Sequence, residues 1–188
     1  TDIVFWGTNY LERTDFKTGF LGVNEPFEKK DYIRLGLWNR LRTAFAFFQK
    51  MSGNPAFFNA SLLDSFTGFL GYYFYPKDYV GLFNFLPWNE EEINTTLEGY
   101  GWEKEEGYPS TWRIGDGTSA LYNYIYARVA GFSENDTFRS NQIREGYITR
   151  TDALQKALSE NMPRKESLDW YFRTIGVDGN RALSIINT

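Results

Sequence analysis

The sequence predicts an α/β fragment dominated by α-helices, in which the end of a parallel sheet is followed by a helical C-terminal region. Two observations lead to this class. Residues 2–9 form an apolar run that ends in glycine and small polar residues, which is typical of a buried parallel strand opening into a loop. Residues 112–175 read as consecutive short helices, each with a start signal and most with a stop signal.

The first half of the chain combines a loop, a helix and a segment of ambiguous type. Residues 11–30 are polar and dotted with glycine, which indicates a loop. Asp31 is expected to cap an amphipathic helix that ends at Gly53, and its apolar positions three and four residues apart are Leu37, Leu41, Phe45 and Phe48. Residues 57–75 fit a helix or a strand, and residues 79–85 have strand character.

A helix is expected to follow Asn89, which is a natural N-cap. Glu90, Glu91 and Glu92 come next, in the first turn, where the helix dipole favours negative charge. The alternative is that the three glutamates bind a metal ion. Consecutive helical residues do not share a face, so charge at the helix end explains them better.

Four further helices are expected after residue 112, and a glycine follows three of them. Asp116 or Thr118 caps the first, and Ser133 starts the second with a capping box that uses aspartate in place of glutamate. Thr149 starts the third helix with the same signature, and the fourth covers residues 165–175. The stop signals are Gly131, Gly146 and Gly176, and Pro163 separates the last two helices. The end of the chain is expected to be a tail.

The composition restricts the chemistry that the chain can carry out. Its 188 residues include no cysteine and no histidine. These absences remove disulfides, thiolate nucleophiles, zinc–thiolate sites, the commonest general base and the commonest transition-metal ligand. Chemistry by this chain alone would use carboxylates, lysine, tyrosine or serine, or a hard cation held by oxygen atoms. We assign no metal ligands.

The charge and hydropathy of the chain restrict its partners. A net charge of −4 gives no general attraction to nucleic acid or to an anionic membrane, so any anion-binding site must be local. No secretory signal opens the chain, and no run approaches 18 apolar residues. We therefore expect no nucleic acid and no membrane among the partners, and a cytoplasmic localisation. The aromatic content of 19% predicts a core built from large rings, with an aromatic-lined ligand surface as the alternative.

Two clusters in the second half could bind an anion. Residues 115–119, Gly-Asp-Gly-Thr-Ser, lie where a loop becomes a helix N-terminus, a geometry that suits anions. They lack the lysine and the spacing of a Walker loop, and a glycine-flanked helix cap is the alternative. Arg139, Ser140, Asn141 and Arg144 form the second cluster. Its two arginines do not project from one helical face, so surface salt bridges and phosphate or carboxylate binding both remain open.

Residues 139–154 read Arg-Ser-Asn-Gln-Ile-Arg-Glu-Gly and then Tyr-Ile-Thr-Arg-Thr-Asp-Ala-Leu. This sequence resembles the C-terminal region of PP-loop ATP pyrophosphatases of the N-acetyl sugar amidotransferase type. They are asparagine synthase-like members of the adenine nucleotide alpha hydrolase family, found in bacterial surface polysaccharide pathways. Residues 3–9, residues 86–93 and the Gly-Trp pair at 101–102 follow the same order as in that family. The resemblance is most specific over residues 112–178.

The resemblance implies a Rossmann-like parallel sheet of the PP-loop or HUP type and an adenylating reaction. ATP and Mg²⁺ would activate an oxygen of a sugar substrate, and ammonia would then attack. The Ser-Gly-Gly-x-Asp-Ser loop that defines the family has no copy here, so ATP would bind mainly to residues outside this chain. The chain would be a fragment of a longer protein, a partner subunit or a degenerate relative. The implied partners are an ATP-binding segment or subunit and a glutaminase.

The same resemblance implies the site residues, although the catalytic residues stay unassigned. Gly7, Thr8 and Asn9 would lie near the nucleotide. The residues facing the sugar would be Arg113, Asp116, Ser119, Tyr122 and Asn123, while Arg139, Asn141 and Arg144 would hold a phosphate or carboxylate. Four regions are expected: the strand end and loop of an α/β nucleotide-binding core at 1–30, a mixed aromatic-rich helical region at 31–111, the helical C-terminal region at 112–178 and a tail at 179–188.

Two non-enzymatic functions are alternatives to the substrate-side part of an amidotransferase-like enzyme. The first is a non-catalytic helical interaction module that docks on a PP-loop or glutaminase subunit. The second is a free-standing carbohydrate-binding domain rich in aromatic residues. A carbohydrate-binding domain of this kind fits a β-sandwich pattern better than the mostly helical pattern of this sequence.

Overall fold

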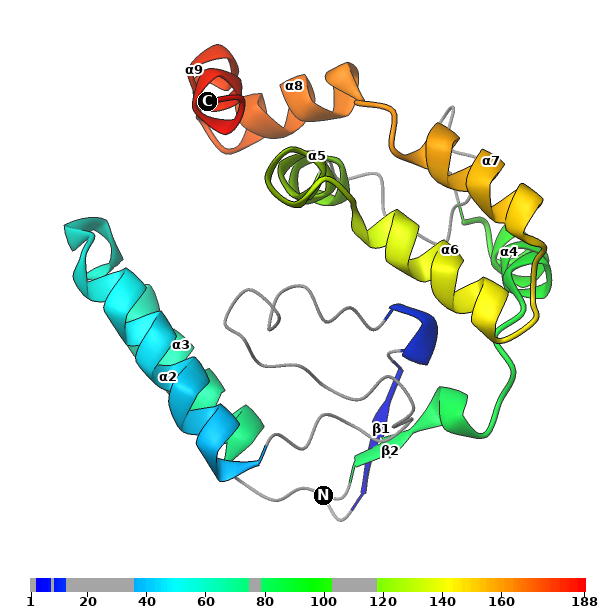
Figure 1. Ribbon diagram of the computed structural model, residues 1–188, viewed down its shortest axis with the longest axis horizontal. Coiled ribbons are helices and arrows are strands. Elements are labelled where there is room, and N and C mark those ends of the chain that lie inside the picture. Colours follow the sequence, from blue (N-terminus) through cyan, green and yellow to red (C-terminus); the bar gives the residue numbers. More distant parts are fainter. Residues whose placement is uncertain (1–2, 8, 13–35, 75–78, 103–117) are drawn as a thin grey trace. The chain divides into compact units, whose positions relative to one another are not determined.

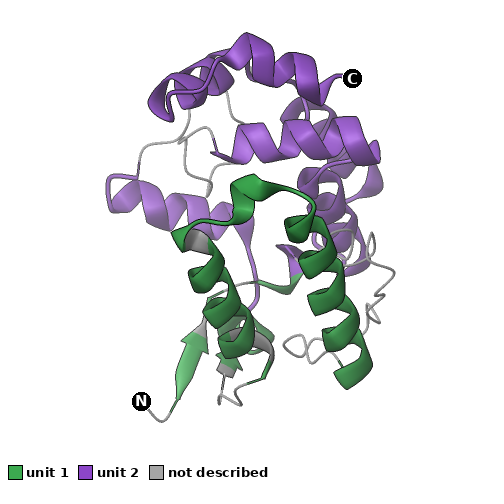
Figure 2. Cartoon of the chain, turned by 90° about the vertical axis from the view of Figure 1, so that its left-hand side faces the viewer, with its two compact units in different colours: residues 1–10, 14–86 green, residues 11–13, 87–188 purple. Residues whose placement is uncertain are grey.

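The computed structural model describes residues 3–7, 9–12, 36–74, 79–102 and 118–188, which are mostly helical with a small two-stranded parallel sheet (Figure 1). The chain divides into two compact units (Figure 2). Unit 1 comprises residues 1–10 and 14–86, and unit 2 comprises residues 11–13 and 87–188. In the part of the chain that the structure describes, no helix is long and apolar enough to cross a membrane.

The sheet of unit 1 is a single parallel pair. Strand β1, Val4–Trp6, pairs with β2, Tyr79–Gly81, in a register that places Phe5 opposite Val80. Both strands were expected, but β2 ends early because the 3-10 helix η3, Leu82–Asn84, follows it at once. The expected burial of β1 is wrong for its described side chains, because Phe5 is exposed and β2 is the only described neighbour. A Rossmann-like sheet therefore stays a prediction.

Two helices make up most of the remaining described residues of unit 1. Helix α2, Leu37–Ser52, is described from Gly36 on, and its expected end before Gly53 is confirmed. The expected cap at Asp31 lies outside the described residues. The 3-10 helix η2, Pro55–Phe57, follows because the Asn54 side chain accepts a hydrogen bond from the Ala56 amide at 3.0 Å. The ambiguous segment at 57–75 is mainly a helix, α3, Ala60–Tyr73.

The described part of unit 2 is a set of helices, and three of them begin at the caps that the sequence predicts. The helices are α4 Glu90–Gly99, α5 Thr118–Ala130, α6 Glu134–Arg144, α7 Arg150–Glu160, α8 Lys165–Thr174 and α9 Gly179–Ile186. Asn89 caps α4 by accepting from the amides of Glu91 and Glu92. The expected capping box at the start of α6 is present, and Thr149 caps α7. The expected stop signals are confirmed, because each of the three glycines after α5, α6 and α8 has a positive φ.

Helix α9 replaces the tail that was expected at the end of the chain. Asp178 caps it by accepting a hydrogen bond from the Arg181 amide at 3.1 Å. Gly179 allows α9 to begin against α8, because a Cβ atom at this position would lie 2.8 Å from the ring of Phe172. The Tyr124 hydroxyl donates to Asn187 at 2.9 Å, which attaches the end of the chain to α5.

The core of unit 2 holds α5 to α8 together. Helix α6 packs on α7, and α5 packs on both α6 and α8. Residues 11–13 belong to this unit because the Asn141 side-chain amide donates to the carbonyl of Leu11 at 2.9 Å. The buried apolar side chains are Leu11, Trp88, Phe138, Ala153, Ala157, Leu168 and Phe172. Burial of these groups supplies the main favourable term in the folding of the unit.

Candidate functional site

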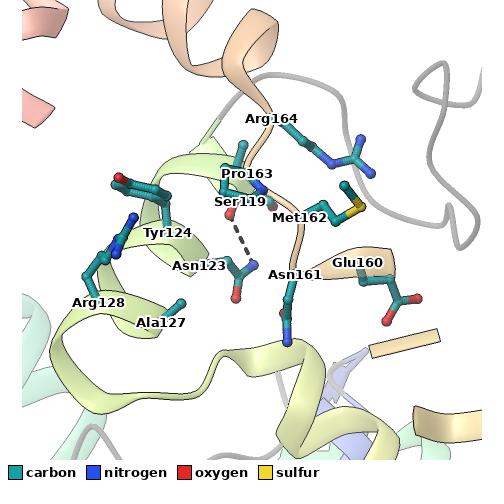
Figure 3. A pocket seen from close by; sticks show the side chains of 11 residues that line it. Ser119, Asn123, Tyr124, Ala127, Arg128, Glu160, Asn161, Met162, Pro163 and Arg164 are labelled. Atoms are coloured by element: carbon teal, nitrogen blue, oxygen red, sulfur yellow. Dashed lines mark hydrogen bonds between the residues drawn. The ribbon is translucent and has the colours of Figure 1, made fainter. Parts of the chain in front are cut away.

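A cleft of about 190 Å³ opens in unit 2 between α5 and the turn that joins α7 to α8 (Figure 3). We call it the α5–α8 cleft. One wall is a single face of α5, because Ser119, Asn123 and Ala127 are spaced four residues apart. The opposite wall is formed by residues 160–164. The complete lining is Ser119, Ala120, Asn123, Tyr124, Ala127, Arg128, Glu160, Asn161, Met162, Pro163 and Arg164.

The α5 wall is fixed by its own polar side chains. The Asn123 amide donates to the carbonyl of Ser119 at 3.0 Å, and its oxygen accepts from the amide of Glu134 at 3.0 Å. Asn123 is thereby buried and links α5 to the first residue of α6. The guanidinium of Arg128 lies over the ring of Tyr124, 5.3 Å from its centroid. This cation–π contact holds a positive charge at the rim of the cleft.

The opposite wall is fixed by the capping box of α6. The Asn161 side-chain amide donates to the carboxylate of Asp136 at 2.7 Å, and its oxygen accepts from the hydroxyl of Ser133. The Asn135 side chain donates to the same oxygen at 3.2 Å and to the carbonyl of Glu160 at 3.3 Å. The turn after α7 is therefore attached to the start of α6 by side chains that are buried or half-buried.

Behind the cleft, Arg139 lies at the centre of a buried ion-pair network. Its side chain is 2% exposed. Nε donates to Glu160 at 3.0 Å, and Nη1 donates to Glu90 at 2.6 Å and to Gln142 at 2.7 Å. Nη2 donates to Glu90 at 3.2 Å and also to Glu160. A guanidinium has five N–H groups, so every donor of Arg139 is committed to the chain itself.

The network shifts the pKa values of two of its members. Burial by itself would raise the pKa of Glu90, but the hydrogen bond and charge of Arg139, with help from Lys156 and Gln142, hold that pKa below its ordinary value of 4.5. Lys156 lies 3.5 Å from the Glu90 carboxylate. Burial by itself would lower the pKa of Arg139, but its hydrogen bonds to Glu160 and Glu90 raise it further above its ordinary value. The charged forms of both groups are therefore the stable ones near neutral pH.

The three residues expected to hold a phosphate or carboxylate do not converge on one point. Arg139 binds two carboxylates, but these are Glu90 and Glu160 of the chain itself. Asn141 is buried with its amide on the Leu11 carbonyl, and its oxygen accepts from Arg144 at 3.1 Å. Arg139 therefore forms salt bridges within the chain, which was the alternative to anion binding. These salt bridges lie in the interior and not on the surface, as the alternative had expected.

The residues expected to face the sugar or the nucleotide are only partly brought together. Ser119 and Asn123 line the α5–α8 cleft, whereas Tyr122 packs edge-on against Tyr126 with centroids 5.9 Å apart. Gly7 is exposed and Asn9 is buried, both in unit 1. The remaining expected residues, Thr8, Arg113 and Asp116, lie outside the described residues.

Several lining residues were missed in the sequence. Arg128 could have been found, because it follows Tyr124 by four positions and therefore shares a helical face with it. Asn161 and Arg164 lie on either side of the Met-Pro pair that separates α7 from α8. Only the contact between this turn and α5 shows that they line a cleft, and no local spacing signals that contact.

The charge of the α5–α8 cleft favours an anionic or strongly polar ligand. Two arginines, Arg128 and Arg164, line it, and its one carboxylate, Glu160, is neutralised by Arg139. Guanidinium groups suit phosphate and carboxylate ligands because their donors form a planar fork. The Ser119 hydroxyl adds a neutral partner for a ligand with several hydroxyls, while the amides of Asn123 and Asn161 are hydrogen-bonded within the chain and keep one N–H each for a ligand. This set can bind and orient a ligand.

A second and wider groove in unit 2, of about 710 Å³, follows the first turn of α4. Its acidic members are Glu90, Glu91, Glu92 and Glu98. In the described part of the chain, no group of three or more carboxylate, histidine or cysteine side chains could hold a metal ion. The Glu90 side chain turns to Arg139, which shows one structural use for the glutamates after Asn89.

No protein-family model, curated protein or solved structure matches the chain. The resemblance to N-acetyl sugar amidotransferases of the PP-loop type therefore stays a prediction.

Proposed function

We propose that unit 2 forms the substrate-side wall of an ATP-dependent, amidotransferase-like PP-loop enzyme, and that its sugar substrate binds in the α5–α8 cleft. The observation that carries the proposal is the cleft itself, where arginine, amide and hydroxyl groups lie on two walls held by hydrogen bonds. Pre-positioned polar groups of this kind orient a ligand with little loss of entropy on binding. Ser119 and Asn123, which the resemblance implies as sugar-facing, are among them.

The chemistry of the proposed reaction agrees with the residues that the chain contains. Adenylation of a substrate oxygen followed by attack of ammonia needs no nucleophilic side chain, only positioning and electrostatic stabilisation. The chain has no cysteine and no histidine, and Glu160 is engaged by Arg139. In this proposal ATP and Mg²⁺ bind mainly to residues outside the chain. The reaction takes place in the cytoplasm, on a sugar of a bacterial surface polysaccharide pathway.

The first experiment measures binding of N-acetylglucosamine and of its phosphate ester to the chain by calorimetry. We expect Arg128→Ala to weaken binding of the phosphate ester about tenfold or more, because a charge-assisted hydrogen bond contributes about 1.5–3 kcal/mol. Arg173→Ala is the matched control. Arg173 is an exposed arginine on α8 that donates to the Asp169 carbonyl and does not line the cleft.

The second experiment tests the reaction class. ATP–pyrophosphate exchange is measured with the chain alone and together with a PP-loop subunit that carries the Ser-Gly-Gly-x-Asp-Ser loop. The proposal expects sugar-dependent exchange in the mixture only. If neither sugar binds, or if Arg128→Ala and Arg173→Ala bind with equal affinity, the cleft is not the substrate site.

A further inference from the structure

Helix α2 of unit 1 carries an apolar stripe that no described segment covers. Its members are Leu37, Trp38, Leu41, Phe45 and Phe48, which we call the α2 face. At about 100° per residue these five side chains fall within an arc of about 100° on one side of the helix. All five are exposed, and Trp38 and Phe45 reach 83% and 66%. The amphipathic pattern expected for this helix is present, but its apolar side is the exposed one.

Part of the opposite side of α2 packs inward, although Phe47 and Lys50 on that side are exposed. Thr43, on the part of the helix opposite the α2 face, is 1% exposed. This arrangement is the reverse of what the hydrophobic effect favours for a surface helix in water. A contiguous exposed patch of large aromatic and aliphatic side chains marks an interaction surface. The 3-10 helix η2 contacts α2 and is followed by the exposed Phe58, which adds another ring nearby.

The charge of α2 indicates what binds there. Residues 37–52 contain Arg40, Arg42 and Lys50 and no aspartate or glutamate. Arg40 and Arg42 fall on either side of the apolar arc when the helix is drawn at about 100° per residue. Arg42 is exposed, whereas the guanidinium of Arg40 lies over the ring of Phe74, 5.6 Å from its centroid. If two copies of the α2 face met, these arginines would approach one another without a carboxylate of the same helix to pair with. An anionic partner fits this charge better.

We propose that the α2 face binds the surface of a membrane with anionic headgroups, with α2 lying in the plane of the interface. Aromatic and leucine side chains would enter the boundary between headgroups and acyl chains, and the flanking arginines would meet the phosphates. The chain has a net charge of −4, so the attraction depends on this local cluster. With 16 residues, α2 is about 24 Å long, shorter than the helices that span a bilayer. The binding is peripheral and does not depend on the function proposed for unit 2.

The test is co-sedimentation of the chain with vesicles of phosphatidylcholine alone and of phosphatidylcholine mixed equally with phosphatidylglycerol. We expect binding to the mixed vesicles that weakens about tenfold or more in pure phosphatidylcholine and again at high salt. Phe45→Glu should reduce binding to the mixed vesicles about tenfold or more, because it removes an apolar anchor and adds a repelling charge. Phe85→Glu is the matched control, because Phe85 is 77% exposed in the same unit but lies outside α2.

Folding of each variant is checked by circular dichroism. Arg42→Glu, which changes an arginine beside the α2 face, provides a second variant in case Phe45→Glu does not fold. Equal binding of variants on the α2 face and of the Phe85→Glu control would overturn the proposal, as would failure of the wild-type chain to sediment with mixed vesicles. A dimer in sedimentation equilibrium that Phe45→Glu dissociates would assign the face to a second copy instead. A protein partner that needs Phe45, without any vesicle binding, would overturn the proposal in the same way.

Discussion

Arg139→Met is the most informative single change in unit 2, because it removes a cation that binds both the half-buried carboxylate of Glu90 and the buried carboxylate of Glu160. Methionine keeps most of the apolar length of the side chain, so the loss is mainly one of charge and of five hydrogen bonds. Removing one partner from a buried ion pair costs about 3–5 kcal/mol, because the remaining charges are left without compensation. We expect a loss of this size in the free energy of unfolding, large beside the stability of a typical domain.

The assay is urea denaturation at neutral pH, followed by circular dichroism and by tryptophan fluorescence, to which the buried Trp88 contributes in unit 2. Arg144→Ala is the matched control, five residues further along the chain. Arg144 is exposed, and it donates a hydrogen bond to the Asn141 side chain at 3.1 Å. We expect this control to change the free energy of unfolding by less than about 1 kcal/mol.

The loss of stability in Arg139→Met should depend on pH in a direction that a general loss of packing would not produce. The folded-state pKa of Glu90 is lowered, so its contribution to stability is complete above the unfolded value of about 4.5 and is lost as the pH falls through the folded pKa. In Arg139→Met the Glu90 carboxylate loses its cation and accepts a proton more readily. The stability gap between wild type and variant should therefore narrow as the pH falls from 7 towards 4.5.

Two results would refute this reasoning. One is an Arg139→Met protein with wild-type unfolding free energy and weakened ligand binding, which would return Arg139 to a ligand-binding role. The other is a stability gap that stays constant with pH. The triple variant Arg139→Met, Glu90→Gln, Glu160→Gln should recover part of the lost stability, because it removes the unpaired charges as well.

Four further substitutions test local features of the fold. Ser133→Ala removes the capping box of α6 and should cost about 1–2 kcal/mol, measured by urea denaturation. Gly68→Ala places a methyl group in open space on α3 and should stabilise the fold by about 0.5–1 kcal/mol. Gly146→Ala should destabilise it by about 1 kcal/mol, because the φ of Gly146 is +76°. Thermal denaturation compares the two variants. Asp178→Ala removes the cap of α9 and should speed amide hydrogen exchange there more than in α7.

The sequence was most informative where the interactions are local. Asn89, Ser133 and Thr149 each accept from backbone amides within three residues, so their roles follow from residue type and spacing. The same signature is present at Asp178, but the expectation of a tail at 179–188 missed it. An eight-residue helix at the end of a chain has too few turns to show a clear periodicity.

The parts that the sequence did not predict depend on contacts between distant segments. Arg139 meets Glu160 across 21 positions and Glu90 across 49, and no local spacing encodes such pairs. The outward position of the α2 face is another case. A periodic pattern identifies which side of a helix is apolar, but it does not identify what covers that side. The expected apolar positions of α2 were therefore correct as a pattern and gave no information about the core of unit 1.

Glu160 connects the two parts of unit 2 that matter most, because it lines the α5–α8 cleft and also binds Arg139. Arg139 thus lies one side chain behind the proposed ligand site and acts as a positioning residue. Under this arrangement Arg139→Met should weaken ligand binding only together with a loss of stability, since the turn after α7 loses its anchor. Arg128→Ala should weaken binding with stability unchanged, because Arg128 is exposed at the rim. Measuring affinity and unfolding free energy for both variants separates these roles, and an Arg139→Met protein that loses stability but keeps its full ligand affinity would show that the network and the cleft are independent.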